Sequence, residues 1–280
     1  MYEGVTTYLG DLYLLKSGVF SLNSYLKELE RQFQKHFDNH GRFNYSVGES
    51  SYDTWLDGYV KGVPGRKVSI YVEGCLLAFV TDFMIRKANN NKIGLERVMK
   101  QMYYHPDIVE NGYQEATYRE ILESVSSISF KELFDNYVNG IHSYEGILTD
   151  ALDYFGLELS RTPSPSYAES VLGIKTIQNK DKTRIIDISP GSPADMSGLT
   201  LGDEIIAVNN TMVNKNLDKW LKYFDGKTHC LQISRNNELI NLDMPTLNRT
   251  FFQIIKIQVK KEASDKQIKA RQSWGCLDGR

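Results

Sequence analysis

The sequence predicts a protein with more than one domain, mostly helical in its first half and of mixed α+β structure in its second. Up to about Phe155, apolar residues recur at the spacing of packed helices. A stretch rich in proline and serine then interrupts this pattern. Beyond it, apolar and polar residues alternate, which indicates strands. We therefore expect helices at residues 1–160, a linker at 161–170, an α+β domain at 171–247, and a tail of one strand and one helix at 248–280.

The composition is that of a globular protein and excludes several functions. A chain of 280 residues can hold two domains, and its net charge of -2 leaves no basic surface for nucleic acid. Three widely spaced cysteines without a CxxC pair argue against a thiolate zinc site and a disulfide framework. The apolar run 68–85 is interrupted by Glu73 and Asp82. It therefore predicts a buried helix and not a membrane span.

The helices of the first half follow from spacing and capping. Val5, Leu9 and Leu12 share one face of a helix over residues 2–16. Ser21 is expected to cap a second helix that ends near His36. A polar loop is then predicted over residues 39–66, and an apolar helix containing Tyr71 after it; further helices are predicted at 93–103, 117–125, 130–137 and 144–155.

The second half predicts short strands joined by turns. Ser192 is expected to cap a short helix, with Pro193 at its first position and Gly198 at its end. The pair Asn209–Asn210 indicates a tight turn. Strands are predicted at 184–188, 204–208, 230–234, 239–244 and 251–259, and a helix at 217–224.

The turn residues of the second half stand in a recognisable order. Residues 189–194 read Ser-Pro-Gly-Ser-Pro-Ala, Gly198 and Leu199 follow, and residues 201–209 read Leu-Gly-Asp-Glu-Ile-Ile-Ala-Val-Asn. This order resembles a PDZ domain of the kind found in bacterial proteases. The resemblance implies an α+β fold that adds an extended peptide to a sheet edge and receives its terminal carboxylate on backbone amides. The matching loop is Leu172, Gly173 and Ile174, and the alternative is a domain that only braces the peptidase.

Two segments of the helical half resemble the gluzincin peptidases, a class of zinc enzymes. Residues 2–8, Tyr-Glu-Gly-Val-Thr-Thr-Tyr, are similar to the segment that carries the third zinc ligand, which implies that Glu3 is that ligand. Residues 68–74, Val-Ser-Ile-Tyr-Val-Glu-Gly, are similar to an S-x-Y-x-K-G segment, which implies that the Tyr71 hydroxyl donates to the oxyanion. Glu73 departs from the lysine of many relatives. By spacing alone, Glu3 is an ordinary acid of a first helical turn and Tyr71 a core aromatic.

Together with the run Ser-Tyr-Asp-Thr-Trp at residues 51–55, these segments resemble the glycyl aminopeptidase family over nearly the whole chain. The resemblance implies a bacterial zinc peptidase that removes N-terminal glycine, and sometimes alanine, from peptides. It leaves the compartment open, cytoplasmic or periplasmic. The HExxH zinc motif of such enzymes is absent from the sequence. His36 and His40 have its spacing, but Phe37 replaces its glutamate, and we expect a solvated helix end there.

These observations lead to three alternatives. The first is the C-terminal part of a zinc aminopeptidase, inactive by itself because Glu3 alone cannot retain zinc. The second is a non-catalytic PDZ protein that binds peptides and descends from a degenerate peptidase. The third, an accessory part of a serine protease, is weakened by the helical first half, which has no nucleophile segment.

Overall fold

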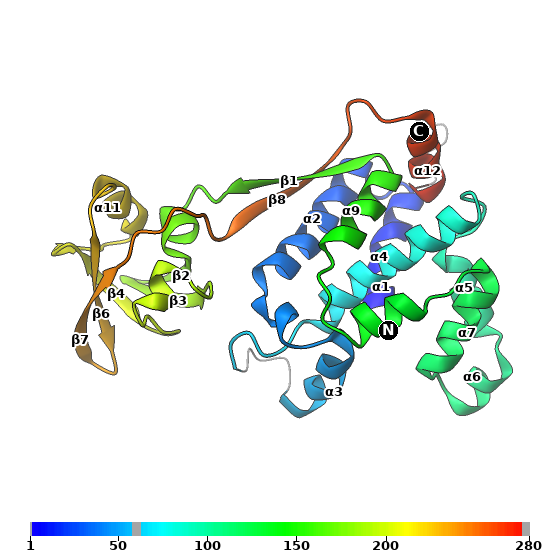
Figure 1. The fold of residues 1–280 in the computed structure, drawn as a ribbon, viewed down its shortest axis with the longest axis horizontal. Coiled ribbons are helices and arrows are strands. Elements are labelled where there is room, and N and C mark those ends of the chain that lie inside the picture. Colours follow the sequence, from blue (N-terminus) through cyan, green and yellow to red (C-terminus); the bar gives the residue numbers. More distant parts are fainter. Residues whose placement is uncertain (1, 58–62, 276–280) are drawn as a thin grey trace. The chain divides into compact units, whose positions relative to one another are not determined.

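The computed structural model describes residues 2–57 and 63–275 and divides the chain into two compact units. The helical unit contains Met1–Ser160 and Ile255–Arg280, and the sheet unit contains Arg161–Ile254 (Figure 1). The predicted linker, residues 161–170, thus belongs to the sheet unit. Most of the predicted tail returns to the helical unit, where its helix α12 (Asp265–Gly275) packs. The chain passes between the units within β1 (Leu157–Pro163) and β8 (Gln253–Val259), which pair with each other.

The helical unit is built around α4. In the first half of the chain its elements are α1 (Tyr2–Lys16), α2 (Leu22–Asp38), η1 (His40–Phe43), α3 (Val47–Asp57), α4 (Ile70–Ala88), α5 (Leu95–Tyr103), α6 (Pro106–Asn111), α7 (Glu115–Ser126), α8 (Lys131–Leu133), η2 (Phe134–Val138) and α9 (Glu145–Tyr154). Helix α4 is apolar on nearly all sides and is buried along most of its length, because α1, α2 and α9 pack around it. The predicted buried helix is confirmed. Among the described residues, no helix has the length and apolarity needed to cross a membrane.

A buried polar network joins four helices of this unit. The carboxylate of Asp82, on α4, accepts hydrogen bonds from Tyr8 Oη at 2.6 Å, from Arg86 Nε at 3.0 Å and from the backbone N–H of Leu95 at 2.8 Å. Trp274 Nε1, on α12, donates to Tyr8 Oη at 2.8 Å. Asp82 and Arg86 are fully or almost fully buried. The network therefore ties α1, α4, α5 and α12 together at one point of the core.

The prediction of a loop over residues 39–66 is wrong for the part that forms η1 and α3. Helix α3 begins after Ser46, whose hydroxyl accepts from the N–H of Glu49 at 3.1 Å, while the Glu49 carboxylate accepts from the N–H of Ser46 at 3.0 Å. This reciprocal pair is a capping box. The polar composition of the segment concealed it, because α3 has few apolar residues and exposes Trp55.

Among the described residues, the sheet unit has a six-stranded antiparallel sheet in which β2-β3-β4-β6-β7 are neighbours in that order and β5 pairs with β4. Its elements are η3 (Ala168–Leu172), β2 (Ile174–Asn179), β3 (Lys182–Ile188), α10 (Pro193–Met196), β4 (Glu204–Val208), β5 (Thr211–Met212), α11 (Leu217–Tyr223), β6 (His229–Arg235) and β7 (Glu238–Met244). Leu172, Ile205, Leu221 and Ile233 belong to its separate apolar core. The predicted α+β fold of this half is confirmed.

The residues predicted to begin a helix or to form a turn in this unit do so. Ser192 caps α10, its side chain accepting from the N–H of Asp195, and Pro193 takes the first turn. Asn209 and Asn210 have φ of 45° and 60° in the turn between β4 and β5. Both positions require a left-handed backbone, which asparagine tolerates better than most residues.

The buried carboxylate of Asp203 links the expected stability of the sheet unit to pH. Its buried carboxylate accepts from Arg235 Nη2 at 2.7 Å and from the N–H of Thr200 at 2.8 Å. Burial raises the pKa of Asp203, but the hydrogen bonds from Arg235 and Thr200 outweigh it and hold the pKa below its usual value. A carboxylate with a lowered folded pKa stabilises the fold above its unfolded pKa, and this contribution is lost as the pH falls through the folded value.

We therefore expect the sheet unit to lose stability below about pH 4. In Asp203→Asn, stability at neutral pH is lower and this acid dependence is smaller. Denaturant unfolding of the sheet unit, followed by hydrogen exchange at neutral and acid pH, measures both effects. The matched control is Glu204→Gln, which removes the partner of the exposed Lys182 and should change little. An equal acid loss in wild type and Asp203→Asn would contradict this assignment.

Candidate functional site

Two glycines bring α1 and α4 into backbone contact. A Cβ atom added to Gly4 would lie 2.2 Å from the carbonyl carbon of Gly74, and one added to Gly74 would lie 2.8 Å from Cα of Gly4. Real Cβ atoms do not approach other atoms this closely. The absence of both side chains therefore permits the crossing, which explains why Gly follows Glu3 in one segment and closes the other at residue 74.

The two helices run parallel from this crossing. Gly4 meets Gly74, and one turn further along α1, Tyr8 bonds Asp82 and packs on Phe79. The N-terminal ends of both helices therefore lie at the same end of the pair. Glu3 is the residue before Gly4, and Tyr71 is three residues, or less than one helical turn, before Gly74. The fold thus brings these two candidate residues to one end of one helix pair.

The side chains at this end are accessible. Glu3 is half-buried, and Tyr71 has 36% of its surface exposed. Ser69 fixes the start of α4, its hydroxyl accepting from the N–H of Val72 at 3.4 Å. Two parallel helix N-termini create a positive potential that favours negative charge. This end of the helix pair therefore favours negative charge, such as an oxyanion that develops near Tyr71.

The described residues do not by themselves complete a zinc site. Within residues 2–57 and 63–275, no three side chains of His, Cys, Asp or Glu are grouped so that they could hold a metal ion. In the same part of the chain, no hydrogen bond or ion pair of the Glu3 carboxylate is found. Glu3 therefore fits the role of one carboxylate ligand, and the other ligands would have to come from outside these residues. The assignments of Glu3 and Tyr71 stay predictions.

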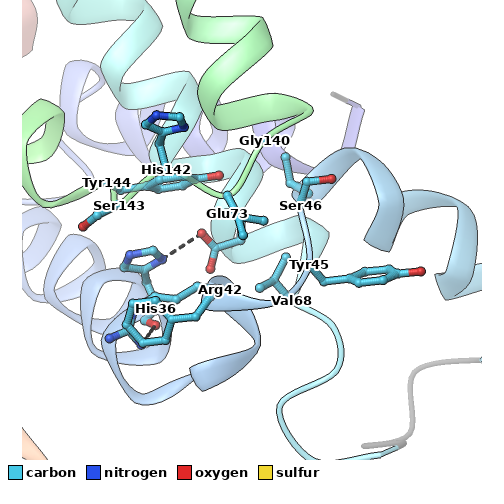
Figure 2. A pocket seen from close by; sticks show the side chains of 13 residues that line it. His36, Arg42, Tyr45, Ser46, Val68, Glu73, Gly140, His142, Ser143 and Tyr144 are labelled. Carbon is cyan, nitrogen blue, oxygen red and sulfur yellow. Dashed lines mark hydrogen bonds and ion pairs between the residues drawn. The ribbon is translucent and has the colours of Figure 1, made fainter.

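The prediction of a solvated helix end at His36 is wrong. His36 and Glu73 are each 2% exposed, and His36 Nδ1 donates to Glu73 Oε2 at 2.7 Å (Figure 2). The imidazole also stacks on the ring of Tyr144, with ring centroids 4.9 Å apart. The bond between His36 and Glu73 holds α2 against the first turn of α4, the turn that contains the candidate Tyr71. Glu73, which replaces the lysine of relatives, thus has a partner suited to a carboxylate.

The pocket beside this pair is small and partly polar. It is lined by His36, Arg42, Phe43, Tyr45, Ser46, Val47, Val68, Glu73, Gly140, Ile141, His142, Ser143 and Tyr144 (Figure 2). Burial, and then the charge of Glu73, raises the pKa of Tyr144 well above its usual value. Glu73 Oε1 is buried without a hydrogen-bond partner in the described structure, beside a cavity of about 10 Å³. That volume is the size needed by about one water molecule, too small for a peptide.

The predicted carboxylate loop of the sheet unit lies between η3 and β2. Gly173 adopts a left-handed conformation with φ of 72°, and its N–H donates to the carbonyl of Ala168 inside the unit. Leu172 and Ile174 are both buried in the core. Strand β2 pairs only with β3 in the described sheet, so its other edge is a place where a strand can add. The peptide-binding role of Leu172, Gly173 and Ile174 stays a prediction.

The fold consists of a helical region joined to an α+β domain of the PDZ type. Comparison with protein families supports both parts. Residues 1–77 match the family model described as M61 glycyl aminopeptidase, and residues 170–246 match the PDZ domain. The chain therefore contains a region similar to the M61 glycyl aminopeptidases, followed by a region similar to PDZ domains. No curated protein matches the chain.

Solved structures extend the comparison of folds. A crystal structure of an aminopeptidase N family protein from Idiomarina loihiensis is similar with a TM-score of 0.85 and 24% identity. The match covers 98% of this chain and 48% of that one, so the chain spans about half the length of the solved structure. A structure of the HtrA3 PDZ domain bound to a phage-derived ligand matches 36% of the chain with 17% identity and a TM-score of 0.24.

Proposed function

We propose that these 280 residues are part of a zinc-dependent aminopeptidase that removes N-terminal glycine or alanine from peptides. The parallel crossing at Gly4 and Gly74 carries this proposal, because it brings Glu3 and Tyr71 to the same end of one helix pair. The M61 match over residues 1–77 supports it independently of that geometry. In this proposal the HExxH motif comes from sequence outside the 280 residues.

Each residue has a separate task in the proposed reaction. Bound zinc would lower the pKa of its water and polarise the substrate carbonyl. Glu3 would hold the metal through one carboxylate oxygen. The Tyr71 hydroxyl would donate to the oxyanion that forms when the carbonyl is attacked. The His36–Glu73 pair would keep the first turn of α4, and with it Tyr71, in position. The PDZ domain would bind a peptide or brace the peptidase.

The test is zinc content and aminopeptidase activity in the full-length gene product. We expect about one zinc per chain in wild type and none in Glu3→Ala. Tyr71→Phe should retain zinc while turnover falls by about 10²–10³, the usual effect of removing one oxyanion donor. The matched control is Tyr13→Phe, which changes an exposed tyrosine further along α1. The 280-residue chain by itself should retain no zinc and show no activity.

Two results would contradict the proposal. Zinc that survives in Glu3→Ala would remove Glu3 from the metal site. No zinc in either protein would indicate a degenerate peptidase, and the PDZ domain would then be the place to look for function, as a peptide receptor.

A further inference from the structure

In the loop expected to bind a peptide carboxylate, the backbone N–H of Gly173 already has a hydrogen-bond acceptor within the domain. A PDZ domain receives a peptide carboxylate on backbone N–H groups that point out of this loop. Here residues 168–172 form the π-helix η3, and the N–H of Gly173 closes it by donating to the carbonyl of Ala168. A carboxylate must replace that internal acceptor before Gly173 can bind it. The loop in this structure is therefore in a closed state.

A segment from the end of the domain covers the same glycine. We define the strap as residues 249–252, which follow β7 and lead into β8. The N–H of Phe251 donates to the carbonyl of Ser170 at 3.0 Å, in the middle of η3. A Cβ on Gly173 would lie 3.2 Å from Cγ of Phe251. The Phe251 ring and backbone thus hold both η3 and the loop that follows it.

The strap is itself attached on both sides of Phe251. Arg249 Nη2 donates to the carbonyl of Gly191 at 2.7 Å, and its guanidinium lies 4.7 Å from the centroid of the Phe251 ring. On the other side, the N–H of Ser164 donates to the carbonyl of Phe252 at 3.3 Å. Phe251 is 8% exposed but belongs to neither main apolar core. A ring that is held in place by these contacts, but lies outside both apolar cores, suits a contact with the loop that can be released.

A second set of contacts holds the start of η3 on α11, the helix that would form the other wall of a peptide groove. Asp218 accepts from Ser166 Oγ at 3.1 Å and from the N–H of Ala168 at 2.9 Å. Tyr167 Oη donates to Asp225 Oδ1 at 2.7 Å. The element η3 is therefore fixed at its beginning by contacts with α11 and at its end by the strap. Of these two, only the strap is found near Gly173, where Phe251 Cγ and, closer still, Ser192 of the α10 cap lie beside the place where a Cβ would stand.

We propose that the strap is an autoinhibitory contact: Phe251 keeps the Leu172–Gly173–Ile174 loop closed, and a peptide carboxylate binds only after the strap leaves and η3 unwinds. This inference rests on the peptide-binding role proposed above for the PDZ domain. Because only the open fraction binds, the apparent dissociation constant rises by the ratio of closed to open molecules. Weakening the strap should therefore increase affinity without any new contact to the peptide.

The experiment uses the 280-residue chain and two measurements. Hydrogen exchange over residues 168–173 reports opening of the loop without any ligand. Fluorescence polarisation with short fluorescein-labelled peptides, ending in an apolar residue with a free or an amidated C-terminus, reports carboxylate binding. In Phe251→Ala we expect exchange in this segment to rise about tenfold, and the free-acid peptides to bind about tenfold more tightly than to wild type. The amidated peptides should gain nothing.

The controls separate release of the strap from loss of the fold. Leu239→Ala removes an exposed side chain of β7, outside the strap, and it should behave as wild type. Arg249→Ala changes an exposed residue and weakens the same strap, so it should move both measurements in the direction of Phe251→Ala even if that variant unfolds.

Each contrary outcome has a distinct meaning. Unchanged exchange in both strap variants, or wild type that binds free-acid peptides as tightly as they do, overturns the autoinhibitory contact. Faster exchange without any peptide binding overturns the carboxylate site itself, and with it the peptide-binding part of the proposed function. Neither outcome affects the zinc test of Glu3 and Tyr71.

Discussion

Replacing Asp82 by alanine is expected to lower the free energy of unfolding of the helical unit by about 3–5 kcal/mol, the usual cost of breaking a buried ion pair. Asp82 is 0% exposed and accepts from Tyr8, Arg86 and the backbone of Leu95. Among the residues that the structure describes, its removal leaves the guanidinium of Arg86, 2% exposed, with the partly exposed Glu96 as its remaining charged partner. A buried charge without its main partner is the reason for the large cost.

Denaturant unfolding followed by the helical circular dichroism signal measures this loss. Arg119→Ala is the matched control, because it breaks an exposed pair with Glu123 on α7. Such surface pairs contribute about 0.3–0.5 kcal/mol. A loss below about 1 kcal/mol in Asp82→Ala would mean that the network is dispensable for the core. Asp82→Asn keeps the shape of the side chain, and it should fall between wild type and alanine.

Gly4→Ala is expected to cost about 3 kcal/mol, the upper part of the usual range for overpacking. The added methyl group would meet the backbone of Gly74 at 2.2 Å, and a backbone cannot move aside as a flexible side chain can. The helices must therefore separate at the point that positions Glu3 and Tyr71. We expect stability and, in the full-length gene product, activity to fall together.

The control for this prediction lies on the same helix. Gly10 has no atom within 4 Å of the place where a Cβ would stand. Gly10→Ala should therefore stabilise the chain by about 0.5–1 kcal/mol through helix propensity. Thermal and denaturant unfolding of both variants measure the contrast. If Gly4→Ala is as stable as Gly10→Ala, the close crossing of α1 and α4 is wrong.

Local signals in the sequence predicted much of the fold. The caps at Ser21 and Ser192 and the turn at Asn209 act through residues next to them in the chain, and the structure has all three. Strand β4 occupies the predicted residues 204–208. The capping box of Ser46 and Glu49 was equally local and could have revealed α3, but the polarity of the segment favoured a loop.

Long-range contacts could not be predicted in this way. His36 was expected in solvent because its neighbours in the chain are polar, whereas Glu73 and Tyr144, far away in sequence, bury it. The packing of the C-terminal tail on the helical unit was not predicted, for the same reason. Strand β8 docks on α2, with the N–H groups of Ile255 and Ile257 donating to Gln34 and Glu30.

By itself the sequence determined the two kinds of domain and the PDZ turns, because these depend on spacing along the chain. The candidates Glu3 and Tyr71 came from the resemblance of their segments to the gluzincin peptidases. Only the tertiary structure decided that Gly4 and Gly74 cross in parallel, and that Gly173 is closed by Ala168 and covered by Phe251. Those features arise from atoms that are distant in sequence and meet only when the chain is packed, so no local pattern encodes them.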